Sequence, residues 1–170
     1  MADAGLDIPR TAAPFIGRIL DGDGHMYMDA QMLREIAGDL DGGHMVDFIG
    51  QYVGSDTFVA DRNRNRDELW NVKGIAALGA YDPAERIEAL DSMGMRAQLT
   101  FYNTGSGELR IDSPAARAAC RRYNDYSLAW QKQTGDRARV AMEINMGDRD
   151  WALEETARVI KAGAKIITLP

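Results

Sequence analysis

The sequence is poor in cysteine and has no long apolar segment. Cys120 is the only cysteine among 170 residues, so no internal disulfide can form, and a reducing cytoplasmic location is the simplest expectation. No apolar run approaches the roughly 18 residues that a membrane-spanning helix needs. The first residues also lack the basic start and the apolar stretch of a secretory signal. We therefore expect a protein without a membrane partner.

Positive charge is in the minority. The chain has 20 Lys and Arg residues against 26 Asp and Glu residues, which gives a net charge of −6 and a pI of about 4.9. A nucleic-acid-binding protein would show a basic patch or stripe, so a nucleic-acid partner is not expected. The apolar content of 45% is ordinary and predicts one globular domain with a core. The nine methionines and three tryptophans are explained by core packing and need no cofactor.

The first part of the chain has the less regular pattern. Residues 1–14 are small and polar with two prolines, which predicts a flexible leader before a domain at 15–170. The segment Phe15–Asp21 predicts a strand that runs into Gly22–His25. An irregular excursion occupies about residues 26–74. Within it we expect two short amphipathic helices and one charged, solvated loop, at Ala30–Ala37, Met45–Val53 and Asp61–Asp67.

A regular alternation of helices and strands follows. Capping residues, prolines at the first helical turn and terminal glycines bracket the apolar periodicity of each helix. Asp82 is the expected cap of the first of these helices, and Glu85 is expected to reach back to the cap backbone. The last helix is expected to face inward with Ala152, Thr156, Val159 and Ile160. The predicted helices start at Asp82, Ser113 and Asp148 and end at Gly94, Gly135 and Gly163, and the predicted strands are Ala97–Tyr102, Ala138–Ile144 and Lys165–Leu169.

Strands that alternate with helices indicate right-handed βαβ crossovers and a parallel sheet. Two architectures share this order, a doubly wound open sheet and a (β/α)8 barrel. Both place their active sites at the carboxyl ends of the strands. The periodicity leaves the choice between them open.

Asp23 and His25 follow the first predicted strand, where such a site is expected. Residues two apart on a strand point to the same side, so these two side chains can converge on one ion. A carboxylate oxygen and an imidazole nitrogen suit Zn²⁺, Mn²⁺ or Fe²⁺. The pattern Asp-x-His is common by chance, and the ordinary interpretation is a capping aspartate beside a partly exposed histidine.

Several segments resemble the amidohydrolase-related family, a branch of the metal-dependent hydrolases that includes aminocarboxymuconate-semialdehyde decarboxylase. The resemblance covers most of the chain from about residue 16. It is carried by the segments Ile19–Tyr27, Leu78–Arg86, Ile87–Tyr102, Arg122–Asp125 and Ala162–Lys165.

The resemblance implies a fold, a site and an activity. The fold is α/β, the N-terminal half of a TIM-type (β/α)8 barrel with strands 1–4. Asp23 and His25 take the positions of the first-strand metal ligands, with Zn²⁺ expected and Mn²⁺ or Fe²⁺ as alternatives. The implied activity is that of a metal-dependent hydrolase or carboxy-lyase, a decarboxylase, acting on a small carboxylated substrate.

The chain departs from the family pattern in ways that bear on the metal site. Many relatives have a glutamate where this sequence has Met28, and relatives with a His-x-His pair would need histidine at Tyr27. Relatives complete the site with a later histidine and an aspartate near the last strand, beyond the four strands here. His44 is expected at the surface. Two ligands fall short of the three that hold catalytic zinc, so this chain alone is expected to be inactive.

Other polar residues and other functions remain as alternatives. Asn103, Glu143 and Asn145 are candidates for pocket lining, although satisfying loop backbone is the more ordinary role for each. Thr104–Gly107 is glycine-rich and suggests a flavodoxin-like phosphate-binding module, although no helix is expected directly after it. A third alternative is a non-catalytic truncated remnant. Its unpaired edges at Ile16–Leu20 and Ile166–Leu169 would favour a homodimer.

Overall fold

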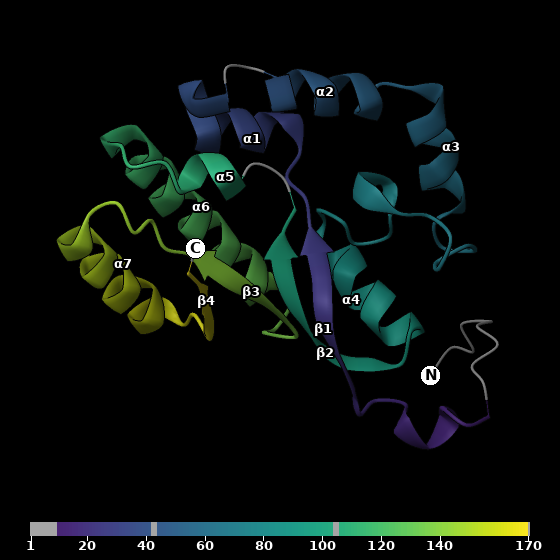
Figure 1. The fold of residues 1–170 in the computed structure, drawn as a ribbon. Coiled ribbons are helices and arrows are strands. Elements are labelled where there is room, and N and C mark those ends of the chain that lie inside the picture. Colours follow the sequence, from purple (N-terminus) through teal and green to yellow (C-terminus); the bar gives the residue numbers. More distant parts are fainter. Residues whose placement is uncertain (1–9, 42–43, 104–105, 170) are drawn as a thin grey trace.

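The computed structural model describes residues 10–41, 44–103 and 106–169, and its centre is a parallel β-sheet. The four strands are β1 (Ile19–Met26), β2 (Met95–Tyr102), β3 (Ala138–Glu143) and β4 (Ile166–Thr168). Their order in the sheet is β1-β2-β3-β4, and each neighbouring pair is parallel (Figure 1). The predicted parallel α/β fold is thereby confirmed. The described strands contain no point at which the strand order reverses, and such a reversal is the mark of a doubly wound sheet.

Three helices form a layer on one face of this sheet. They are α4 (Pro83–Ser92), α6 (Pro114–Gln133) and α7 (Arg149–Ala162), each joining one strand to the next. The middle helix, α6, contacts both α4 and α7. Between the layers, Trp130 and Val159 from the helices pack with Met26, Val140 and Met142 from the strands, all of them buried. This cluster is the core that ties the helices to the sheet.

The excursion between β1 and α4 folds into a second layer with its own core. It contains α1 (Ala30–Ala37), η2 (Gly38–Asp41), α2 (His44–Val53), α3 (Asp56–Arg64) and η3 (Gly74–Ala76). Apolar residues of these helices, among them Leu33, Ile36 and Phe58, pack with Ala119 and Tyr123 of α6. Figure 1 shows α1 and α2 beyond the carboxyl ends of β1 and β2. The excursion therefore lies at the end of the sheet where parallel folds place their sites.

The first strand was predicted too early in the chain. Residues Ala13–Phe15 form the short helix η1, and Gly17 adopts a positive φ of 72°, which turns the chain before β1 begins at Ile19. The strand then continues through Gly22 and Gly24, beyond the strand end that was predicted at Asp21. The leader predicted at residues 1–14 falls on residues 1–9, which lie outside the described residues, on a turn at residues 10–12 and on the start of η1.

The predicted charged loop at Asp61–Asp67 was also wrong in its first half. Helix α3 runs through Arg64 because Ser55 caps it, accepting a hydrogen bond from the Phe58 amide at 3.2 Å, and because the charges pair with one another. Arg64 pairs with Asp61 at 2.7 Å and with Glu68 at 2.6 Å. Side-chain pairs three and four residues apart are typical of a helix, so a charge-rich sequence does not by itself indicate a loop.

The other helix predictions are confirmed, with two corrections of detail. The cap residues Asp82, Ser113 and Asp148 all accept hydrogen bonds from backbone amides of the following turn, and Gly163 ends α7 in the left-handed conformation. Glu85 does not return to its own cap; its carboxylate pairs with Arg62 at 2.6 Å. Ile160, expected to point inward, is 57% exposed, because the buried face of α7 runs through Ala152, Glu155 and Val159 instead.

Candidate functional site

β1 contains a β-bulge shortly before its carboxyl end. Asp21 and Gly24 pair with residues of β2 that are two apart, so Gly22 and Asp23 together oppose the single residue Leu99. The Asp21 carboxylate accepts a hydrogen bond from the Asp23 amide at 3.0 Å across the bulge. A bulge adds one residue to a strand and redirects the side chains beyond it. Asp21 therefore does not share a side with Asp23, although the two are an even number of residues apart.

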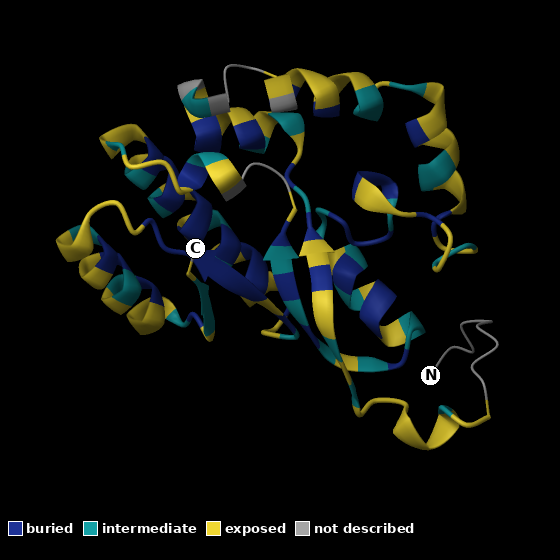
Figure 2. Ribbon diagram, viewed as in Figure 1, coloured by how far each residue is buried: buried dark blue, intermediate teal, exposed yellow. Residues whose placement is uncertain are grey.

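The contact between Gly24 and Gln98 fixes which side each residue takes. A Cβ at Gly24 would lie 2.1 Å from the Cδ of Gln98, so any larger residue there would have to displace the Gln98 side chain. Gln98 is buried and bonded to α4, so Gly24 faces the helix layer. Asp23 and His25 flank Gly24 and thus lie together on the opposite side, where both are exposed. Exposed bands on β1 are visible in Figure 2.

Asp23 and His25 thus lie inside the strand rather than after it, and their convergence on one ion stays a prediction. Both lie in the carboxyl-terminal half of β1, on the sheet face opposite the layer formed by α4, α6 and α7. Their donor atoms, a carboxylate and an imidazole, fit a borderline or hard divalent metal ion. Among the described residues no group of three or more His, Cys, Asp and Glu side chains is arranged to hold a metal ion.

A buried arginine lies directly behind this strand. Arg86 of α4 is 7% exposed, and its guanidinium donates from Nε to Gly79 O at 2.7 Å and from Nη1 to Gln98 Oε1 at 2.7 Å. Its third nitrogen, Nη2, donates to His25 O at 2.5 Å. The guanidinium carbon also lies 5.7 Å from the centre of the Trp130 ring, a cation–π contact. The main chain of the candidate ligand His25 is therefore held from the helix side.

A second hydrogen bond links Arg86, through Gln98, to Asp21 at the bulge. Gln98 Nε2 donates to Asp21 Oδ2 at 2.5 Å, so the amide bridges the guanidinium and the carboxylate. Burial lowers the pKa of Arg86 to about 10, and the negative charge of Asp21 acts in the opposite direction. Arg86 was not among the site residues predicted from the sequence. Its spacing of four from Leu90, on the apolar side of α4, was the signal that could have found it.

The three candidates for pocket lining lie in different environments. Asn103 is exposed after β2, and its amide donates a short hydrogen bond to the Tyr27 hydroxyl, two residues beyond His25. Asn145 is fully buried, and its Nδ2 donates to Leu109 O at 2.7 Å and to Ile111 O at 2.8 Å. The bonds of Asn145 are those of a strand-end amide that satisfies loop backbone.

Glu143 is the candidate with a perturbed charge. Glu143 is 5% exposed at the carboxyl end of β3, and its carboxylate pairs with Arg110 at 3.2 Å. Burial raises the pKa of Glu143, and the charge and hydrogen bonds of Arg110 only partly oppose this. Strand-end carboxylates with a raised pKa are suited to hold a proton, a property found at functional sites and also in structural ion pairs.

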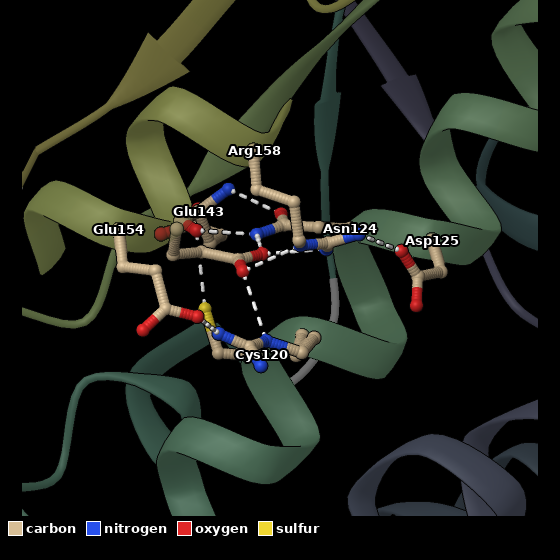
Figure 3. A network of polar contacts seen from close by, with 8 residues as sticks. Cys120, Asn124, Asp125, Glu143, Glu154 and Arg158 are labelled. Atoms are coloured by element: carbon tan, nitrogen blue, oxygen red, sulfur yellow. Dashed lines mark hydrogen bonds and ion pairs between the residues drawn. The ribbon is translucent and has the colours of Figure 1, made fainter. Parts of the chain in front are cut away.

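A larger buried network joins β3, α6 and α7 (Figure 3). Asn124 donates to Glu143 O at 2.9 Å and accepts from Glu143 N at 3.0 Å, so it takes the place of a strand neighbour. It also donates to the buried carboxylate of Glu155, which is paired with Arg121 at 3.0 Å and Arg158 at 2.7 Å. All the residues of this network lie on the adjacent elements β3, α6 and α7, so the network holds these elements together. Asn124 is therefore a structural residue that joins α6 to β3 and α7.

Cys120 borders the same network and is not a reactive thiol. Its Sγ donates to Glu143 O at 3.1 Å, and the side chain is fully buried. Burial raises the pKa of Cys120 to about 12. The thiolate is the form that attacks electrophiles and binds metals, so this cysteine is a core residue.

Two further motifs of the sequence contribute little to the site. His44 is the first residue of α2 and is exposed, as predicted. Thr104 and Gly105 lie outside the described residues, and the short helix α5 (Ser106–Leu109) follows them directly. The expectation that no helix begins there was wrong, although four residues are too few for the summed dipole that favours phosphate.

Comparisons with protein-family models, with curated proteins and with solved structures each returned no match. None of the described helices combines the length and the apolar composition that crossing a membrane requires.

Proposed function

We propose that this chain forms the N-terminal half of an amidohydrolase-type (β/α)8 barrel and supplies the first two metal ligands of a hydrolase or carboxy-lyase. The observation that carries the proposal is the placement of Asp23 and His25. They lie side by side near the carboxyl end of the first strand, on the sheet face opposite the helix layer. In a barrel this face is the interior, and the carboxyl ends of its strands surround the active site.

The strand order supports the same proposal. A sheet that adds each new strand at the same edge, with every crossover helix in one layer, curls toward closure as strands are added. A doubly wound sheet would instead place helices on both faces. The flavodoxin-like alternative lacks this second layer among the described residues.

In the proposed site Asp23 and His25 hold a divalent ion, with Zn²⁺ expected, and further ligands come from outside the four described strands. When bound, such an ion activates a water molecule or polarises the substrate. His25 contributes as a neutral imidazole and Asp23 as a carboxylate. The Tyr27 hydroxyl and the Asn103 amide, bonded to each other beyond His25, lie where a small carboxylated substrate would meet hydrogen-bond donors.

The presence of only two histidines in the sequence gives a direct test of metal binding. Imidazole signals of the protein are followed by NMR during titration with Co²⁺, a paramagnetic substitute for Zn²⁺. We expect the signal of His25 to broaden at low Co²⁺ and that of His44 to remain sharp, since His44 lies on α2. Asp23→Ala should weaken the effect, and Asp47→Ala, which removes an exposed carboxylate on α2, should not.

The opposite result would remove the basis of the proposal. If both imidazoles respond equally, or if Asp23→Ala leaves the titration unchanged, the two residues do not form a metal site. In any protein that contains the complete barrel, Asp23→Ala and His25→Ala are each expected to abolish turnover. Full turnover by either variant with metal bound would show that the altered residue is not a ligand.

A further inference from the structure

The guanidinium of Arg86 is a charged group that is buried behind the candidate site, and its burial opposes folding. Removing a charged group from water requires free energy that only good hydrogen bonds and nearby charges recover. Arg86 recovers it by aiming each of its three nitrogens at a different acceptor: Gly79 O, Gln98 Oε1 and His25 O. One of these acceptors is the main-chain carbonyl of a proposed metal ligand.

The same acceptors define the conformation of β1 around the bulge. Gln98, held by Arg86, donates to Asp21, and Asp21 accepts from the Asp23 amide. Gly24 lies against the Gln98 side chain with no room for a Cβ. The hydrogen bonds therefore run from the guanidinium to both sides of the bulge, to His25 directly and to Asp23 through Gln98 and Asp21.

We propose that Arg86 is a positioning residue for the metal site. It fixes the main chain of β1 so that Asp23 and His25 point together to the uncovered face. This inference rests on the proposed function, since it assigns Arg86 a role in a site that Asp23 and His25 form. Removing a group that hydrogen-bonds to a metal ligand and orients it typically lowers metal affinity about 10- to 100-fold.

The shape of the guanidinium matters more than its charge in this role. Lysine keeps the positive charge but offers a single nitrogen at the end of a flexible stem, so it cannot hold three separated acceptors at once. Arg86→Lys is therefore the informative variant. Arg137→Lys is its matched control, because Arg137 also donates to strand carbonyls, to Arg96 O at 3.1 Å and to Met95 O at 2.7 Å, at the far end of β2.

The experiment compares the unaltered protein, Arg86→Lys and Arg137→Lys with two measurements. The first is the Co²⁺ concentration that broadens the His25 imidazole signal. The second is the hydrogen-exchange rate of the backbone amides of β1 without metal, relative to those of β3. We expect Arg86→Lys to need about 10- to 100-fold more Co²⁺ and to show faster exchange in β1 alone. Arg137→Lys should change neither quantity.

Each result has a defined meaning. The inference is overturned if Arg86→Lys binds Co²⁺ like the unaltered protein, or if its β1 amides exchange no faster than those of Arg137→Lys. Failure of the proposed function is a different result: Co²⁺ then leaves His25 of the unaltered protein sharp, while the exchange rates still report whether Arg86 holds the strand. Should Arg86→Lys fail to fold, Gly24→Ala displaces Gln98 with Arg86 intact and is expected to weaken Co²⁺ binding; unchanged binding would again overturn the inference.

Discussion

At the scale of single residues, two buried charges set much of the interior of this protein. Arg86 and Glu155 both lie on the buried faces of helices, at positions where the pattern alone predicts apolar side chains. Each is surrounded by groups that satisfy it: carbonyl and amide oxygens around Arg86, and Arg121, Arg158 and Asn124 around Glu155. Buried charges are tolerated only with such partners. Sequence periodicity does not identify the partners, because they come from other elements.

Glu155→Gln should destabilise the protein by about 2 kcal/mol at pH 7, because Arg121 and Arg158 lose a buried ion-pair partner. The loss is limited to this size because both arginine side chains are about one-third exposed to water. Burial opposes ionisation of Glu155, but hydrogen bonds from Arg158 and Asn124 and the arginine charges outweigh it, so the pKa is lowered. A lowered pKa stabilises the fold above the ordinary glutamate value of about 4.3, and this contribution disappears as the pH falls through the lowered pKa.

The measurement is urea denaturation of both proteins from pH 7 down to acid pH. The difference in unfolding free energy should be largest near neutrality and should shrink below about pH 4. The neighbouring variant Glu154→Gln is the control, since Glu154 is 70% exposed and has a single ion pair with Arg121. A pH-independent difference for Glu155→Gln would mean that its effect does not come from the ionised carboxylate.

At the scale of elements, two glycines set how closely neighbouring segments approach. Gly24 allows β1 to lie against Gln98, and Gly79 allows the turn before α4 to lie against that helix. A Cβ at Gly79 would be 2.4 Å from the Cα of Arg86, and the residue also has a positive φ of 73°. The position of Arg86 in the interior thus depends on glycine in the preceding turn.

Gly79→Ala should therefore cost about 3 kcal/mol or more, the sum of left-handed strain and a backbone clash that no rotamer relieves. Gly17→Ala is a matched control, because Gly17 has nearly the same φ of 72° but open space around its Cα. It should cost about 1 kcal/mol, from strain alone. Thermal or urea denaturation compares the two variants, and equal losses would show that the contact with Arg86 does not matter.

At the scale of the whole molecule, the described residues leave the outer edges of β1 and β4 without a strand neighbour and leave β1 exposed on one face of the sheet. Helices cover the opposite face, while β1 and β4 each have one strand neighbour. Leu20 is 68% exposed. It precedes Asp21 in the strand, so its side chain lies on the face opposite Asp21 and Gln98, which is the face of His25. Open strand edges and apolar faces favour association. The predicted homodimer stays a prediction with a clear physical reason.

Light scattering coupled to size-exclusion chromatography should find two 18.8 kDa chains per particle. Four strands from each chain would complete the eight of a closed barrel. Leu20→Lys, which places a charge on the open face, should shift the particles toward monomer. Leu153→Lys, a change on the outer surface of α7 at 62% exposure, should leave the mass unchanged. A monomer in the unaltered protein would contradict the pairing of half barrels.

The sequence alone determined the order of elements and most of their ends. Local rules act over a few residues, and these include the caps at Asp82, Ser113 and Asp148 and the left-handed Gly163. The Asp-x-His pair could also be read directly, because strand alternation is local. The end of the first strand was predicted wrongly at Asp21, since a glycine that ends a strand and one that admits a close neighbour look alike in sequence.

Only the tertiary structure decided what lies behind and around that pair. The bulge that separates Asp21 from Asp23 depends on the register between β1 and β2, and register is a property of two strands. The burial of Arg86 and Glu155 depends on acceptors and donors far away in the chain, such as His25, 61 residues from Arg86. Contacts over such separations leave no local pattern, and the strand order β1-β2-β3-β4 likewise emerges only when the helices pack in one layer.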